Sequence, residues 1–282
     1  MKPNPGKIFP PGHFYSPIPD LNEIEKRKDS IFKLRKDEEI LGLNINKEEQ
    51  LQWLHKIADY FKDFPFPLEK PAEDYNGYFL NNGLFEGLDG VAYFAFIREL
   101  QPVRIIEVGA GYSSILAMET NRRFFNGKIE VTLIEPFPSK VLSEYLSKHP
   151  YVTLIEKPVQ DLEASLFESL QENDILFIDS THVAKVGSDV NFLIFEVLPR
   201  LKKSVWIHFH DIFIPDEYPQ KWVFEENRAW NEMYILKAFL MYNEFFKICF
   251  SSYYVYTRFK DDVINLFRKA LSGGSIWIRK VR

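Results

Sequence analysis

The chain has 282 residues, a formal net charge of -5 and a single cysteine, Cys249. This length suits one large domain, or one domain with an appendage. The acidic balance argues against a broad phosphate-binding surface, and we expect no nucleic-acid partner. One cysteine excludes an internal disulfide framework and a cysteine-based metal cluster. With no bilayer-length apolar run and no secretory h-region evident, we expect a cytoplasmic protein without membrane contact.

The first hundred residues predict two segments ahead of the main domain. Residues 1–20 are rich in proline, which fixes φ and lacks an amide hydrogen, so this segment is expected to be extended and irregular. It also holds His13, Phe14 and Tyr15, so it is either a mobile tail or an ordered cover over a cleft. Residues 21–100 predict a helical cap, with helices over residues 21–36, 48–64 and 85–100.

From residue 101 to residue 282, strands alternate with helices. The expected strands cover residues 103–108, 129–134, 152–155, 174–178, 204–209, 245–250 and 275–279. The expected helices cover residues 113–125, 139–148, 162–171, 188–201 and 227–241. This order implies right-handed crossovers and a parallel sheet. We predict an α/β fold, a Rossmann-like seven-stranded and mostly parallel sheet sandwiched by helices.

The most informative motif is the glycine turn after the first expected strand. Glu107 ends a β-branched run, Gly109 and Gly111 follow, and a helix is expected to begin by Ser113. Glycines let the backbone approach a ligand closely, and a helix N-terminus exposes unpaired N–H groups. The motif therefore predicts a nucleotide-like cofactor at the carboxyl end of the sheet.

A second acid, Glu135, ends the second expected strand. In a doubly wound sheet, this position faces the ribose of a bound cofactor, although an ordinary surface glutamate would fit as well. A dinucleotide fingerprint requires a third glycine, and Ser114 occupies that position. The carboxylate of Glu107 also disfavours a pyrophosphate and suits an ammonium group.

This combination resembles the class I, Rossmann-like family of S-adenosyl-L-methionine-dependent methyltransferases, over about residues 80–280. The resemblance implies that Glu107, Gly109 and Gly111 hold the methionine portion, and that Glu135 holds the ribose. Near the adenine it places Gln160 and Asp161, for which a surface loop is an equally good account. Asp179, at the end of the fourth expected strand, is also counted among the cofactor-binding residues.

Polar side chains follow the fourth and fifth expected strands. Asp179 and His182 follow the fourth strand. The fifth strand ends with His208, His210 and Asp211, and its alternation places His208 and His210 on one face. We select His182, His210 and Asp211 as candidate catalytic residues.

Three interpretations of these groups stay open. Asp179, His210 and Asp211 bind Mg²⁺ or another divalent cation, as in similar small-molecule O-methyltransferases that hold magnesium with acids after these strands. Alternatively, His182 or His210 is a metal-free general base. In the third interpretation, the histidines only support the loops. The catechol-type enzymes have Asp-Asn where this chain has His210-Asp211.

Two segments are expected to meet the acceptor. Residues 78–89 are similar to a segment of uncharacterised bacterial methyltransferases, and we select Asn82 and Asp89 there, with a turn and a helix N-cap as the alternative. The long aromatic loop over residues 215–230 is expected to act as a lid. Its Tyr218 and Trp222 could stack on a planar or sugar acceptor, anchor the loop or form a homodimer contact.

The preferred hypothesis is therefore methyl transfer to a small-molecule hydroxyl oxygen, with S-adenosyl-L-methionine as the donor. An NAD-dependent oxidoreductase, a catalytically silent cofactor-binding module and a metal-dependent hydroxylase-like relative are the alternatives. The oxidoreductase would need a third glycine or a basic cradle for the pyrophosphate, and neither is evident in the sequence.

Overall fold

A seven-stranded sheet forms the centre of the computed structural model, which describes residues 9–149 and 152–282. The strand order is β3-β2-β1-β4-β5-β7-β6. The strands are β1 (Arg104–Val108), β2 (Glu130–Ile134), β3 (Thr153–Ile155), β4 (Ile175–Ile178), β5 (Trp206–Phe209), β6 (Phe246–Ser251) and β7 (Ile276–Lys280). The first five are parallel, and β7 runs antiparallel between β5 and β6. The predicted Rossmann-like, mostly parallel sheet is confirmed.

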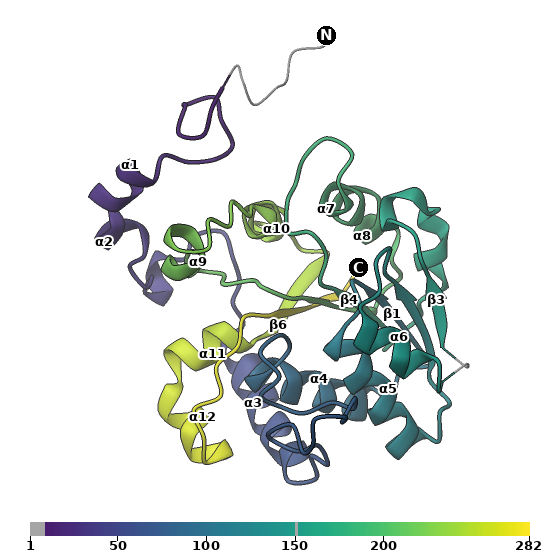
Figure 1. Cartoon of the computed structure of the whole chain (residues 1–282). Helices are drawn as coiled ribbons and strands as arrows, with labels where there is room; N and C mark the ends of the chain where they lie inside the picture. The colour runs from purple at the N-terminus through teal and green to yellow at the C-terminus, as the bar shows by residue number, and fades with distance from the viewer. Residues whose placement is uncertain (1–8, 150–151) are drawn as a thin grey trace.

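Helices cover both faces of the sheet (Figure 1). Side chains alternate along each strand, so Phe177 of β4 faces one layer and Ile178 the other. The Phe177 layer contains α3 (Lys47–Phe61), α4 (Gly87–Leu100), α5 (Tyr112–Phe125), α6 (Lys140–Leu146), α11 (Ser252–Arg258) and α12 (Lys260–Phe267). The Ile178 layer contains α7 (Asp189–Phe192), α8 (Leu198–Arg200) and α10 (Glu232–Leu240). The carboxyl ends of the five parallel strands lie along one edge of the sheet between these layers.

The N-terminal part forms short helices, α1 (Leu21–Lys26) and α2 (Lys28–Ile31). Residues 9–20 form turns that stand away from the sheet, at the upper left of Figure 1, so they do not cover the strand ends. The rest of the proline-rich segment, residues 1–8, lies outside the described residues. None of the helices that the structure describes is long and apolar enough to cross a bilayer.

Four predicted helices differ from the structure. The helix predicted over residues 21–36 is replaced by α1 and α2, which end at Ile31. Residues 162–171 do not form an α-helix, because Leu162 and Glu163 are extended between the 3₁₀ segments Val159–Asp161 and Ala164–Ser169. The predicted helix over residues 188–201 contains a π-helical turn, Leu193–Val197. Pro199 follows this turn, and its missing N–H and bulky ring disrupt regular α-helical bonding.

The helix predicted over residues 227–241 begins only at Glu232, in α10. Asn227 has a left-handed backbone with φ 53°, and the residues after it form a loop. Further helices that we did not predict are α9 (Gln220–Phe224), α11 and α12. The late start of α10 matters for the site, because it leaves residues 230–232 free to pack against the strand ends.

Candidate active site

The glycine turn joins the end of β1 to the first turn of α5. Gly109 has φ +81°, and a Cβ atom added there would lie 1.7 Å from the carbonyl oxygen of Asp179. Gly111 differs, because a Cβ atom added there would meet no described atom within 4 Å. Gly109 is therefore required by the fold, whereas Gly111 leaves room for a ligand beside the N-terminus of α5.

Glu107 is fully buried at the end of β1. The hydroxyl groups of Ser113 and Ser114 both donate hydrogen bonds to its Oε1 atom. The bond from Ser114 is 2.8 Å long. Its Oε2 atom is buried and has no hydrogen-bond partner among the described residues. Burial raises the pKa of Glu107 to about 8, although the serine hydrogen bonds oppose this shift. An ammonium group would give this carboxylate the missing partner.

Glu135 follows β2 and lies beside the glycine turn. Its Oε2 atom accepts a hydrogen bond from the Ala110 amide at 3.2 Å, and its Oε1 atom accepts one from the Phe137 amide at 2.8 Å. The two amides fix the carboxylate next to Gly111, where its remaining lone pairs can accept hydrogen bonds from hydroxyl groups. Gln160 and Asp161 lie exposed on the 3₁₀ turn that follows β3.

A second set of groups lies at the ends of β4 and β5. His182 Nε2 is 3.2 Å from Asp179 Oδ1 and 3.6 Å from Asp211 Oδ2. His210 Nδ1 is 3.4 Å from Asp179 Oδ2 and 3.7 Å from Asp211 Oδ1. Each imidazole therefore contacts both carboxylates. Asp179, His210 and Asp211 each place a ligand atom within 4.8 Å of the others, a spacing that could hold a metal ion.

His182 is oriented by the start of α10. Its Nδ1 atom lies 2.8 Å from Oε2 of Glu232, a carboxylate that is 1% exposed. The backbone amides of Asn231 and Glu232 donate to the His182 carbonyl oxygen at 3.1 Å, and the Trp230 ring packs on the imidazole at 4.2 Å. Burial lowers the pKa of His182, but hydrogen bonds to Asp179 and Glu232 outweigh it and raise the value to about 10.

His210 faces a third carboxylate, on α4. Asp89 Oδ2 is 3.7 Å from His210 Nε2 and accepts a 2.8 Å hydrogen bond from the Gly274 amide. The Ser252 and Ser275 hydroxyls both donate to Asp89 Oδ1, each at 2.5 Å. Asp89 is buried, yet these partners hold its pKa below the ordinary value.

Carboxylates outnumber imidazoles in this centre. Among the described residues, four carboxylates (Asp89, Asp179, Asp211 and Glu232) surround two imidazoles (His182 and His210). The imidazoles lower the pKa of Asp179 against the effect of burial, and burial raises the pKa of Asp211 and of Glu232. The negative excess and the oxygen and nitrogen donors fit a divalent cation.

The other histidine of β5 has a different environment. His208 shares a face with His210, as predicted, and Phe209 lies in the opposite layer. It is fully buried and stacks on Phe177 at 4.1 Å. Burial lowers its pKa to about 3, so this imidazole is neutral. His208 therefore belongs to the core under the centre.

The residues predicted to bind the acceptor differ in their contacts with the polar centre. The Asn82 side chain donates to the carbonyls of Phe79 and Phe85 and so closes a turn. Tyr218 is buried, and its hydroxyl accepts the Met233 amide hydrogen bond at 3.0 Å. Asp89 joins the centre through His210.

Trp222 belongs to a stack that reaches the centre. The Arg228 guanidinium carbon is 4.1 Å from the centroid of Trp222 and 4.5 Å from that of Trp230. Trp230 in turn packs on His182. This stack is the part of the predicted lid that contacts the polar centre.

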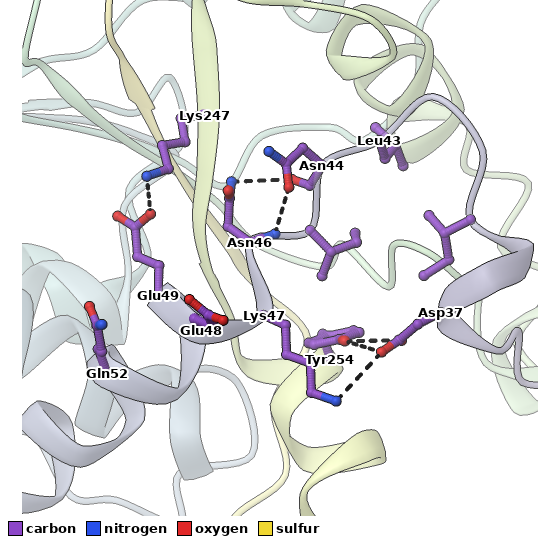
Figure 2. A pocket seen from close by; sticks show the side chains of 12 residues that line it. Asp37, Leu43, Asn44, Asn46, Lys47, Glu48, Glu49, Gln52, Lys247 and Tyr254 are labelled. Carbon is purple, nitrogen blue, oxygen red and sulfur yellow. Dashed lines mark hydrogen bonds and ion pairs between the residues drawn. The ribbon is translucent and has the colours of Figure 1, made fainter.

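A hollow of about 730 Å³ lies elsewhere, between the start of α3, β6 and α11 (Figure 2). None of the predicted site residues lines it. Four of its charged groups form pairs: Lys247 points at Glu49, and Asp37 accepts a hydrogen bond from Tyr254 and faces Lys47 at 4.0 Å. The hollow is therefore separate from the polar groups at the strand ends.

Several residues of the centre were not found from the sequence. Glu232 was assigned to the interior of a longer helix, and its position after Asn231, a residue type that often precedes helices, was the available signal. Ser113 and Ser114 stood beside the motif, but nothing in the sequence indicated that both would bond Glu107. Ser252 and Ser275 are far from Asp89 in the chain, and only the fold brings them together.

Comparison with known proteins shows what this chain is similar to. Residues 106–212 match the family described as "Methyltransferase domain". An uncharacterised protein of Archaeoglobus fulgidus is 50% identical over 171 residues, which are 60% of this chain and 77% of the relative.

Two solved structures are more distantly similar. One of CmcI with Mg-SAM has 16% identity and a TM-score of 0.41, covering 79% of this chain and 84% of CmcI. The SAH-bound N-terminal domain of EvdMO1 has 14% identity and a TM-score of 0.41, covering 88% and 100%.

Proposed function

The chain belongs to the class I, Rossmann-like family of S-adenosyl-L-methionine-dependent methyltransferases, and from that premise we propose that it methylates a hydroxyl oxygen of a small molecule. The methyl group would leave the sulfonium of the cofactor as the acceptor oxygen attacks. The sulfonium already activates this carbon, so the protein must chiefly align the reactants and exclude water.

One observation carries the proposal: Asp179 belongs to both halves of the site. Its carbonyl oxygen packs against Gly109, and its amide donates to the Val108 carbonyl at 2.8 Å. Its carboxylate contacts His182 and His210. The glycine turn and the polar centre are therefore adjacent, as transfer of a methyl group between two bound molecules requires.

The residues of the turn fit the methyl donor. Glu107 would pair its unpartnered Oε2 atom with the ammonium group of the methionine portion. Glu135 would accept hydrogen bonds from the ribose hydroxyls, and the open space at Gly111 would admit the ligand beside α5. A pyrophosphate would instead meet two carboxylates, which disfavours NAD.

At the polar centre, Asp179, His210 and Asp211 would hold a divalent cation. A bound cation would lower the pKa of an acceptor hydroxyl. Asp89 would support His210 from the opposite ring nitrogen. The stack of Trp222, Arg228 and Trp230 would border the acceptor on the side of His182.

A transfer assay tests the proposal. The purified chain is incubated with methyl-labelled S-adenosyl-L-methionine and with small hydroxylated compounds such as catechols, sugars and phenolic polyketides, with divalent ions or with a chelator. We expect label on an oxygen of at least one class, and little product from Asp211→Asn. Cofactor binding without any product, together with an indifferent Asp211→Asn, would identify a silent binding module instead.

A further inference from the structure

We infer that His182 is a fourth metal ligand, oriented by Glu232, and that the site selects a first-row transition-metal ion over Mg²⁺. This inference rests on the cation proposed above for Asp179, His210 and Asp211. It changes the expected chemistry of the site, because it assigns two imidazole nitrogens and two carboxylates to one ion.

The first argument is the arrangement of the four side chains. Imidazole and carboxylate alternate around a closed ring of four contacts at 3.2 to 3.7 Å. Each carboxylate turns one oxygen to His182 and its other oxygen to His210. Ligands at about 2.1 Å from one ion lie roughly 3.0 to 3.4 Å apart at adjacent positions. Asp179, His210 and Asp211 already place one ligand atom each within 4.8 Å of the others, and the His182 side chain would move toward them to become the fourth ligand.

The second argument is the orientation of His182. Glu232 accepts a hydrogen bond from Nδ1 at 2.8 Å, so the proton of the neutral ring is assigned to Nδ1 and the Nε2 lone pair faces Asp179 and Asp211. A carboxylate on the far nitrogen of an imidazole is the usual support of a histidine metal ligand. Trp230 packs on the same ring and restricts its rotation.

The third argument is an unpartnered atom. His210 is 7% exposed, and its Nδ1 atom has no hydrogen-bond partner among the residues described, although carboxylate oxygens of Asp179 and Asp211 lie nearby. A buried polar nitrogen without a partner is costly. A metal ion between these groups would satisfy it.

The donor set then selects the metal. Mg²⁺ prefers oxygen ligands and water, whereas imidazole nitrogen suits iron, cobalt, nickel, copper and zinc. Two nitrogens and two carboxylates therefore favour a transition ion. The competing explanation is a metal-free ring in which two protonated imidazoles neutralise Asp179 and Asp211.

Cobalt binding to the full-length chain decides between these possibilities. Chelator-treated protein is titrated with Co²⁺ by calorimetry and by visible absorption, and then challenged with excess Mg²⁺. We expect one Co²⁺ per chain, bound at least about tenfold tighter than Mg²⁺. We expect affinity to fall about 10- to 100-fold in Glu232→Gln and at least as much in His182→Asn. His55→Ala, an exposed histidine on α3, is the matched control.

Proton NMR of the cobalt form gives a second measurement, independent of affinity. Each imidazole ligand contributes one strongly shifted, exchangeable N–H signal, so we expect two in the wild type and one in His182→Asn. Thermal unfolding confirms that each variant is folded. If His182→Asn fails to fold, the wild-type count alone decides the question.

Two results would overturn the inference. Tight cobalt binding with one shifted signal would leave the cation in place and remove His182 from it, and cobalt binding without preference over Mg²⁺ would remove the selectivity for a transition-metal ion. No binding of either ion would establish the ion-pair ring and remove the cation as well. Titration with S-adenosyl-L-methionine separates both results from failure of the methyltransferase proposal.

Discussion

Gly109 and Asp179 are in direct backbone contact: a Cβ atom on Gly109 would lie 1.7 Å from the Asp179 carbonyl oxygen. This contact joins the ends of β1 and β4 and places the glycine turn beside the polar centre. Gly111, two residues later, has open space where its side chain would be. The two glycines therefore serve different purposes, one in the fold and one in ligand binding.

Alanine substitutions separate these purposes. Gly109→Ala combines positive φ with a backbone clash, so we expect a loss of at least about 1 to 3 kcal/mol in unfolding free energy. Gly111→Ala has extended φ and open space, so we expect stability within about 1 kcal/mol of wild type and at least about tenfold weaker binding of S-adenosyl-L-methionine. Urea unfolding and calorimetry measure the two quantities. Equal cofactor affinity in Gly111→Ala and wild type would contradict this assignment.

The raised pKa of Glu107 should make the stability of the fold depend on pH. Its pKa is about 8 in the folded chain, above its ordinary value of 4.5, so the folded state binds the extra proton between these values. The contribution of Glu107 is therefore fully present below about pH 4.5 and is lost as the pH rises through about 8. Urea unfolding of ligand-free wild type and Glu107→Gln should show the wild type losing stability relative to the variant between about pH 5 and pH 8. Parallel curves would show that this carboxyl has an ordinary pKa.

We expect Glu135 to contribute to the affinity for the cofactor through the ribose hydroxyls. Its carboxylate is already held by the Ala110 and Phe137 amides, so little ordering is needed when hydroxyl groups bind. Hydrogen bonds to a charged group contribute about 1.5 to 3 kcal/mol each, so Glu135→Ala should weaken cofactor binding by at least about tenfold. Glu130→Ala, at the other end of β2 and paired with Arg104 on the surface, is the control and should bind normally. Similar losses in both variants would mean that the effect is general destabilisation.

The contacts of Asp216 indicate that this residue anchors the N-terminal segment around Arg35. This buried carboxylate accepts hydrogen bonds from the Arg35 amide at 2.7 Å, from Arg258 at 2.9 Å and from the Tyr253 hydroxyl at 3.1 Å. Asp216→Ala leaves Arg258 without this partner, and breaking such buried pairs costs about 3 to 5 kcal/mol.

We expect Asp216→Ala to lower the free energy of unfolding, which urea unfolding measures. We also expect faster limited proteolysis near residues 32–40, because their anchor is lost. Glu244→Ala, which removes the exposed partner of Arg282, should change stability by less than about 1 kcal/mol. If both variants behave alike, Asp216 does not anchor the segment.

The sheet and part of the site could be predicted from local patterns. Each strand is a short β-branched or aromatic run, and the crossovers between them fix a parallel order. Polar residues that directly follow strands, such as Glu135, Asp179 and Asp211, share one edge for the same reason. The common face of His208 and His210 followed from the two-residue period of a strand.

The remaining contacts depend on the tertiary structure. The sequence pattern continues α10 back to Asn227, and only the left-handed backbone there and the packing of Trp230 on His182 place Glu232 at the centre. Asp89 meets Ser252 and Ser275 across more than half of the chain. The periodicity of a local sequence segment cannot predict contacts between residues so far apart in the chain.

Calorimetric titration of the purified chain with S-adenosyl-L-methionine, and separately with NAD, tests the central claim most directly. The account predicts one methyl-donor molecule bound per chain with a Kd of about 1 to 100 μM, and no detectable binding of NAD. Binding of NAD alone, or of neither compound, would contradict it and leave the glycine turn with a purely structural role.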